Sequence, residues 1–160
     1  MGVYSQEPRL RYWNRQESEN LSLLKIDKTS KLEQWRALKQ VWFSRRIDEI
    51  SLENFGHFSA GFVQFKSIDS DGMKFLKKSF QANPNFHNFC VDYSEFKDIE
   101  NFLSFLGPAY EFYGEKKWFF KVADVEKCLS IFCDPMNKQF TFGQIDRKHV
   151  PPFDVDIQDS

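Results

Sequence analysis

The sequence has no long apolar run, no even set of cysteines and almost no net charge. No stretch approaches the roughly 18 apolar residues that a membrane-spanning helix needs. The cysteines are odd in number (Cys90, Cys128 and Cys133), which argues against a disulfide framework and favours reduced thiols. The first residues lack the apolar core of a signal peptide, and Gln6 stands where N-myristoylation needs Ser or Thr. We therefore predict a cytoplasmic protein with no membrane segment.

Sequence signals for metals, cofactors and nucleic acid are also missing. The formal net charge is −1, so bulk electrostatics do not favour nucleic acid or membrane surfaces as partners. His57, His87 and His149 are isolated, and Cys128 and Cys133 do not have the spacing of a zinc site. There is no glycine-rich phosphate loop, nucleophile elbow or dinucleotide fingerprint. We predict no cofactor, no metal and no catalytic residue, although an enzyme assembled from distant residues remains an open alternative because it leaves no linear motif.

Aromatic residues are the most unusual part of the composition. The chain has 19 phenylalanines among 160 residues, and aromatics make up 18% of it. Each ring buries about 150–250 Å², so a core can be built largely from rings. This length suits a single unit. We expect one globular domain over residues 1–160, with a polar, basic arm at 1–20 and an acidic tail at 151–160.

The first two thirds of the chain predict a mixture of strands and helices. Residues 21–26 have the composition of a short strand, and Ser30 with Glu33 forms a capping-box pattern. The apolar residues behind this pattern recur at helical spacing, which predicts a helix over 30–45: Leu32, Trp35, Leu38 and Trp42. A short strand near residue 50, a strand at 58–66, a helix at 71–81 and a strand at 86–93 follow.

The last third predicts a helix and then two hairpins. Ser94 can cap a helix over 95–106, which Gly107 and Pro108 end. Residues 110–113 and 118–122 flank a loop at 114–117, and residues 129–133 and 140–145 flank a loop at 134–138. A helix over 123–132 is the alternative to the strand at 129–133, which we favour. The predicted fold class is α+β: a single domain of mixed strands and helices followed by a C-terminal antiparallel meander.

One short segment resembles an RNA-binding motif. The residues Gly61–Phe65 (GFVQF) resemble the last five positions of the RRM signature, whose aromatics stack on bases. The three preceding residues depart from that signature: Phe58, Ser59 and Ala60. The expected element order would also fit the βαββαβ order of that fold. The resemblance implies RNA binding through Phe62, with the basic side chains of the N-terminal arm beside it: Arg9, Arg11 and Arg15.

The helix predicted over 95–106 offers a candidate protein-binding surface. Phe105 falls off its apolar face, on a stripe with Asp98 and Asn101. We expect this ring to be an exposed anchor framed by carboxylates, to which Glu95 and Glu111 would add; packing of Phe105 under the C-terminal sheet is the alternative. The leading hypothesis is a non-enzymatic protein-binding module, in one version a small bacterial inhibitor or immunity protein that masks a toxin. An RNA-binding domain is the alternative.

Overall fold

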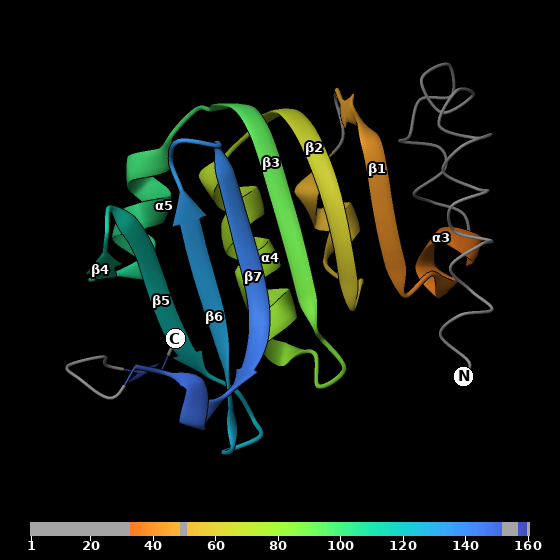
Figure 1. The fold of residues 1–160 in the computed structure, drawn as a ribbon. Coiled ribbons are helices and arrows are strands. Elements are labelled where there is room, and N and C mark those ends of the chain that lie inside the picture. The colour runs from red at the N-terminus through yellow and green to blue at the C-terminus, as the bar shows by residue number, and fades with distance from the viewer. Residues whose placement is uncertain (1–32, 49–50, 152–156, 160) are drawn as a thin grey trace.

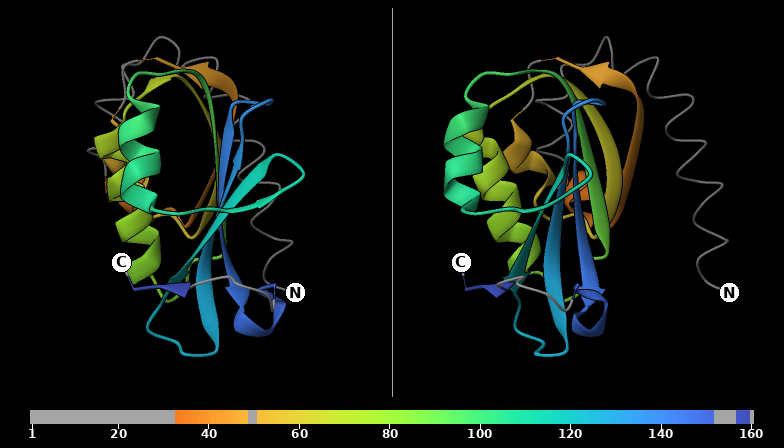
Figure 2. Two further views of the ribbon diagram at one scale, coloured as in Figure 1. Left: turned by 90° about the vertical axis from the view of Figure 1, so that its left-hand side faces the viewer. Right: turned by 60° about the vertical axis from the view of Figure 1, so that its left-hand side comes forward.

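The computed structural model describes residues 33–48, 51–151 and 157–159 (Figure 1). A curved sheet forms one layer and two helices form the other, as both views in Figure 2 show. The strands are β1 (Gln40–Ile47), β2 (Ala60–Ile68), β3 (Asn88–Phe96), β4 (Tyr110–Phe112), β5 (Glu115–Lys121), β6 (Lys127–Asp134), β7 (Gln139–Asp146) and β8 (Ile157–Gln158). The α-helices are α3 (Glu33–Ala37), α4 (Ser70–Ala82) and α5 (Ile99–Leu106), and the 3₁₀ turns are η1 (Leu52–Phe55) and η2 (Arg147–His149).

The sheet is mixed, with a parallel and an antiparallel half. Its order is β1-β2-β3-β7-β6-β5-β4, and β8 pairs with β5. β1, β2 and β3 run parallel to one another, and from β3 to β4 each neighbouring pair is antiparallel. α4 and α5 cover one face of the sheet (Figure 2). These elements confirm the predicted α+β class and the C-terminal meander.

The helix predicted over 30–45 is wrong beyond Ala37. Residues 40–47 form β1 instead, because Val41, Phe43 and Ile47 alternate along a strand that buries one face against the core. β1 pairs parallel with β2, and Val41 lies opposite Gly61. A Cβ atom at residue 61 would come within 2.6 Å of the Val41 carbonyl oxygen, so only glycine permits this close pairing. The strand predicted at 21–26 lies outside the described residues.

The middle elements match the sequence predictions with shifted ends. The strand at 58–66, the helix at 71–81 and the strand at 86–93 correspond to β2, α4 and β3. Near residue 50 the structure has η1 in place of a strand, with residues 49 and 50 outside the described part. The helix predicted over 95–106 begins only at Ile99, because pairing of Glu95 with Ser67 and of Phe96 with Ile68 extends β3.

The predicted hairpins are present, and residues 129–133 are a strand within β6 rather than part of a helix. The first hairpin turns earlier than expected: Phe112 pairs with Glu115, so the loop is Tyr113–Gly114. The described elements α3, β1, β2, α4 and β3 follow the chain order of the βαββαβ pattern after its first strand, and that strand lies outside the described residues. The pairing differs from the RRM fold, because β1, β2 and β3 are adjacent and parallel, whereas the two consecutive strands of that fold pair antiparallel. Among the described residues, no helix is both long and apolar enough to cross a membrane.

The aromatic core lies between the sheet and the two helices. Rings from several elements meet there, and all of the following are buried: Phe55, Phe58, Phe80, Phe89, Phe102, Phe140 and Phe142. Phe80 of α4 packs on Phe142 of β7, with ring centroids 5.3 Å apart, and Phe102 of α5 packs on Phe140 at 5.4 Å. These contacts confirm that rings from both halves of the sheet build one core.

Candidate protein-binding site

The β4–β5 hairpin ends in a two-residue turn that displays a tyrosine. Tyr113 has φ 51° and Gly114 has φ 80°, both in the left-handed region. Two-residue hairpin loops with positive φ at both positions favour Asn or Asp followed by Gly. A tyrosine there costs roughly 1–2 kcal/mol because its Cβ crowds the following carbonyl oxygen. Tyr113 is nevertheless 92% exposed, so no burial within the domain offsets this strain.

A second ring lies beside Tyr113 at the tip. Phe112 is 53% exposed, and its centroid lies 4.4 Å from that of Tyr113 in an edge-to-face arrangement. Tyr110 stacks nearly parallel to Phe112 at 6.5 Å. In Figure 2 (left), the hairpin tip reaches beyond the sheet on the side away from the helices. The tip therefore presents two exposed rings supported by a third.

Another exposed apolar side chain lies at the same end of the sheet. In an antiparallel meander, the β4–β5 and β6–β7 turns lie at one end and the β5–β6 turn lies at the other, as Figure 1 shows. Met136 in the β6–β7 turn is 90% exposed. With Phe112 and Tyr113 it gives this end three of the large exposed apolar side chains in the described part of the chain. This end of the sheet is therefore a candidate for a contact surface.

Charged groups around the tip are paired with each other. The Lys116 ammonium lies 3.7 Å from the Glu111 carboxylate, and that of Lys117 lies 3.8 Å from the Glu115 carboxylate. These four side chains are 39–64% exposed and form two ion pairs at the base of the tip. The tip therefore combines apolar rings with a balanced polar rim, which is also the usual arrangement of protein interfaces.

The edge strand β4 is too short to template a partner strand. It has three residues, Tyr110–Phe112, and short edge strands are one way in which proteins avoid edge-to-edge pairing. This corner therefore offers exposed side chains rather than a strand edge as a candidate contact.

The surface predicted around Phe105 is different from our expectation. Phe105 is only partly exposed, packs against the core and stacks on Phe102 with centroids 6.3 Å apart. The charges over its ring are lysines of α4 rather than carboxylates: the Nζ atoms of Lys74, Lys77 and Lys78 lie 5.5–5.9 Å from its centroid. The expectation of an exposed ring framed by acids is therefore wrong, because α4 packs beside α5.

Asp98 and Asn101 make contacts with α4. The Asp98 carboxylate accepts hydrogen bonds from the backbone N–H and the hydroxyl of Ser70, at 2.7 and 2.6 Å. The hydroxyl bond, together with the backbone bond, lowers the pKa of this carboxyl. Asn101 accepts from the Lys74 ammonium at 3.2 Å. Both residues thus connect the two helices, and Asp98 satisfies the first turn of α4.

The two remaining predicted acids lie apart from each other. Glu95 is exposed near the end of β3, and Glu111 is exposed in β4. Of the five residues predicted to bind protein, only Glu111 therefore belongs to the hairpin. The sequence predicts Tyr113 at the end of the strand over 110–113, whereas the structure has it in the turn. The Tyr-Gly pair between two strands is the sequence signal for that turn.

The RNA-binding alternative has one observation in its favour. Phe62 lies on the face of the sheet opposite α4 and α5 and pairs in register with Trp42, which is 39% exposed. Cys90 of β3 continues this row across the sheet. Two neighbouring aromatics on one sheet face could stack on bases. The basic residues predicted to assist them lie outside the described residues: Arg9, Arg11 and Arg15.

Comparison with known proteins gives one match, to a protein family. Neither the curated proteins nor the solved structures give a match to this sequence. The family model of the FTH domain matches residues 10–109. The matched segment contains α3, the parallel strands β1, β2 and β3, and both α4 and α5. Since the match covers more than half of the 160 residues, the chain belongs to the FTH domain family.

Proposed function

We propose that this protein is a non-enzymatic protein-binding module whose β4–β5 hairpin tip inserts into an apolar groove on a partner protein. The observation that carries the proposal is Tyr113, a bulky exposed ring held in a backbone conformation that disfavours it. Backbone strain at an exposed position supports a functional reason for the residue, since the fold itself gains nothing from it. Phe112 beside it enlarges the apolar contact.

The charge pattern supports an apolar rather than a highly charged partner surface. The flanking carboxylates and ammonium groups already pair with each other, so a partner gains little by opposing them. Tyrosine is enriched among residues that dominate binding energy, because it buries a large area with few rotatable bonds. We therefore expect an affinity that changes little with salt.

The test is a turn variant that removes the ring and relieves the strain. Tyr113→Asn places a residue favoured at this turn position, so the melting temperature should stay equal or rise. Partners are captured from the native host with the wild type and the variant, and the enriched protein is purified and titrated by calorimetry. We expect binding to weaken at least about tenfold, as for an interface anchor.

A matched control uses an exposed apolar residue at the other end of the sheet. Val125 is 70% exposed in the β5–β6 turn, and Val125→Ser should bind the same partner with wild-type affinity. If Tyr113→Asn and the wild type bind every captured protein equally well, the hairpin is not the contact surface and the proposal fails.

Two narrower expectations, a toxin as the partner and a cytoplasmic location, are part of the same proposal. A toxin as the partner is one version of it, and identification of the captured protein tests that version. We also propose a cytoplasmic location, since the three free cysteines suit a reducing compartment.

A further inference from the structure

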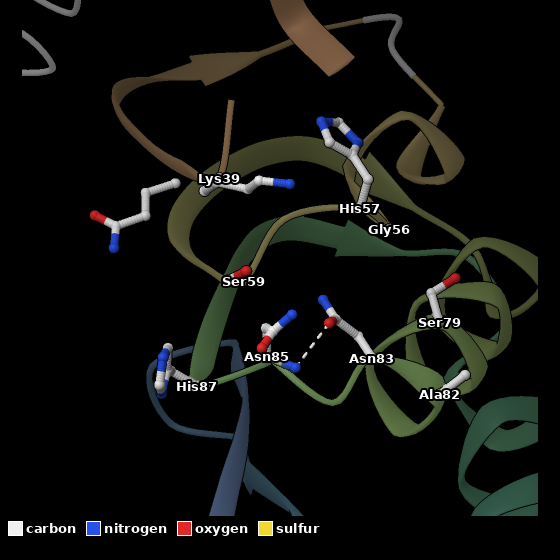
Figure 3. A pocket seen from close by; sticks show the side chains of 10 residues that line it. Lys39, Gly56, His57, Ser59, Ser79, Ala82, Asn83, Asn85 and His87 are labelled. Carbon is white, nitrogen blue, oxygen red and sulfur yellow. Dashed lines mark hydrogen bonds between the residues drawn. The ribbon is translucent and has the colours of Figure 1, made fainter. Parts of the chain in front are cut away.

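A polar cavity of about 600 Å³ lies at the amino ends of the three parallel strands (Figure 3). Lys39, Ser59 and His87 each directly precede one of these strands. Backbone hydrogen bonds join them side by side: the Ser59 N–H donates to the Lys39 carbonyl at 2.7 Å, and the His87 N–H donates to the Ser59 carbonyl at 2.8 Å. The sheet ladder thus aligns three polar residues that are far apart in the sequence.

The end of α4 forms the opposite wall. Ser79 and Asn83 line the cavity there, and Asn85 follows from the next loop. The Asn83 Oδ1 atom accepts from the Asn85 backbone N–H at 3.0 Å, which leaves the amide NH₂ group of Asn83 as a donor. In Figure 3 the ends of Lys39, Asn83 and Asn85 point toward the same hollow.

His57 lines the cavity from the loop after η1. Its Nε2 atom lies 2.9 Å from the Trp35 carbonyl oxygen, and its ring packs on Phe58 with centroids 4.1 Å apart. Burial lowers the pKa of this imidazole below its ordinary value of 6.5, and the charges of Lys39 and Arg36 lower it further. Two cationic side chains, Lys39 and Arg36, therefore act on this side of the cavity.

The cavity has hydrogen-bond donors and a cation but no acidic side chain. Its ten lining residues include one lysine, two histidines and two asparagines, and none is Asp or Glu. Among the described residues, no carboxylate lies within ion-pair distance of the Lys39 ammonium. The carbonyl groups at the end of α4 carry partial negative charge, so a ligand here must be held by several hydrogen bonds as well as by Lys39.

We propose that this cavity binds a small polar molecule through its phosphate or carboxylate group, with Lys39 as the charge partner and Ser59, Asn85 and His87 as hydrogen-bonding groups. A volume of about 600 Å³ exceeds what a lone oxyanion fills and lies within the usual range for small-molecule sites. The polar lining suits a hydrophilic body attached to that group. This site is independent of the β4–β5 hairpin, which lies at the opposite edge of the sheet.

Two-dimensional NMR of the full chain tests the site with defined probes. Inorganic phosphate, acetate and adenosine 5′-monophosphate are titrated separately, with adenosine as the uncharged control. We expect amide shifts at Lys39, Ser59, Asn85 and His87 with at least one oxyanion and none with adenosine alone. Phosphate and acetate together distinguish which oxyanion is preferred. If none of the three oxyanions shifts these amides, the proposal is overturned.

Charge variants then test the role assigned to Lys39. Lys39→Gln should weaken binding of the oxyanion at least about tenfold, since the variant loses the charge-assisted hydrogen bond from the ammonium group. Lys78→Gln removes an exposed lysine of α4 that does not line the cavity, and should leave the affinity unchanged. Equal weakening by both variants, or by neither, would overturn the proposal. Tyr113→Asn should bind the oxyanion normally, which separates this test from that of the hairpin.

A second readout is the titration of His57. An anion in the cavity offsets the nearby positive charges, so the imidazole pKa should rise when the site is filled. Sulfate serves as the probe here because its charge is constant between pH 5 and 8. If saturating sulfate shifts the cavity amides but leaves the His57 pKa unchanged, the ligand does not sit beside His57 and the assignment is wrong.

Discussion

Replacing the buried Lys77 with methionine should stabilise the protein at neutral pH. Lys77 is 2% exposed on the inner side of α4, and its Nζ atom lies 4.0 Å from the centroid of the Phe120 ring and 5.5 Å from that of Phe105. Among the described residues, no carboxylate lies within ion-pair distance of it. The charged groups around it are the other lysines of α4, Lys74 and Lys78, which face the same ring.

The magnitude follows from the pKa of this ammonium group. Burial, with the nearby charge of Lys78, lowers the pKa of Lys77 from 10.5 to about 8. That difference corresponds to a cost of about 3 kcal/mol for keeping the group charged in the folded state. The ring of Phe120 offsets up to about 2 kcal/mol of this through a cation–π contact. Lys77→Met should therefore raise the free energy of unfolding at pH 7 by about 1–3 kcal/mol, since methionine keeps the length of the side chain.

The sign of the pH dependence is fixed by the same values. Between pH 8 and pH 10.5 the unfolded chain binds more protons at this lysine than the folded protein does, so the wild type gains stability as pH rises. The advantage of Lys77→Met should shrink over that range and disappear near pH 10.5. Comparing the variant with the wild type at each pH cancels the contributions of other titrating groups.

Urea unfolding at pH 7, 8.5 and 10 measures these differences, with Lys78→Met as the exposed neighbour control. The control should change the free energy of unfolding by no more than about 0.5 kcal/mol. If Lys77→Met is less stable than the wild type at pH 7, or if its advantage does not decrease with pH, the ammonium is well satisfied in the fold and the reasoning is refuted.

Three further predictions concern the packing of α5, the contact between Asp98 and α4, and the buried cysteines. Phe105→Ala should lower the free energy of unfolding by about 2–3 kcal/mol, less than for a fully buried ring, and a melting temperature within a degree of wild type would contradict the packing seen here. Asp98→Asn should lower the melting temperature at pH 7, because the carboxylate that accepts from Ser70 is lost. The difference in melting temperature from the wild type should shrink as the pH falls below 3.8 through the lowered pKa of the folded carboxyl, since the wild-type carboxyl is then protonated as well. Thermal melts at pH 7 and pH 3 measure this. Burial raises the pKa of Cys90 and of Cys133 to about 11. Both thiols should therefore react about a hundredfold more slowly with a thiol reagent at pH 8 in the native protein than after unfolding. In the unfolded chain, the same reagent should detect three thiols without added reductant.

Elements set by local signals were predictable from the sequence. The β6–β7 hairpin and α4 depend on turn residues and caps close in the chain, such as Asp69, whose carboxylate accepts from the Gly72 N–H at 2.8 Å. β1 was not predictable in this way. Trp35, Leu38 and Trp42 have helical spacing while Val41, Phe43 and Ile47 suit a strand, and pairing with β2 decides between the two.

The candidate sites were also predictable only as far as they depend on residues close together in the sequence. The pattern that places Phe105 off the apolar face of its helix is wrong, because Phe105 packs against the core as Ile99 and Leu103 do. Its contacts also depend on α4, which the pattern of a single helix does not contain. The cavity beside Lys39, Ser59 and His87 needs the parallel register of three strands, and its only sequence signal is a polar residue directly before each strand. Locating Tyr113 in the turn required a loop that begins one residue before the predicted loop at 114–117 and has two residues instead of four.

The place of β7 beside β3 has a consequence for how the chain can be cut and how it folds. The family match ends at residue 109, yet β3 completes its pairing only with β7, between residues about fifty positions apart such as Cys90 and Thr141. A fragment ending at 109 would leave one edge of β3 open and would uncover the rings of Phe80 and Phe102, which pack on Phe142 and Phe140. Closing so long a loop is entropically slow, so the parallel half should gain its stability only after the C-terminal meander has formed. The folding unit therefore extends beyond the matched residues 10–109.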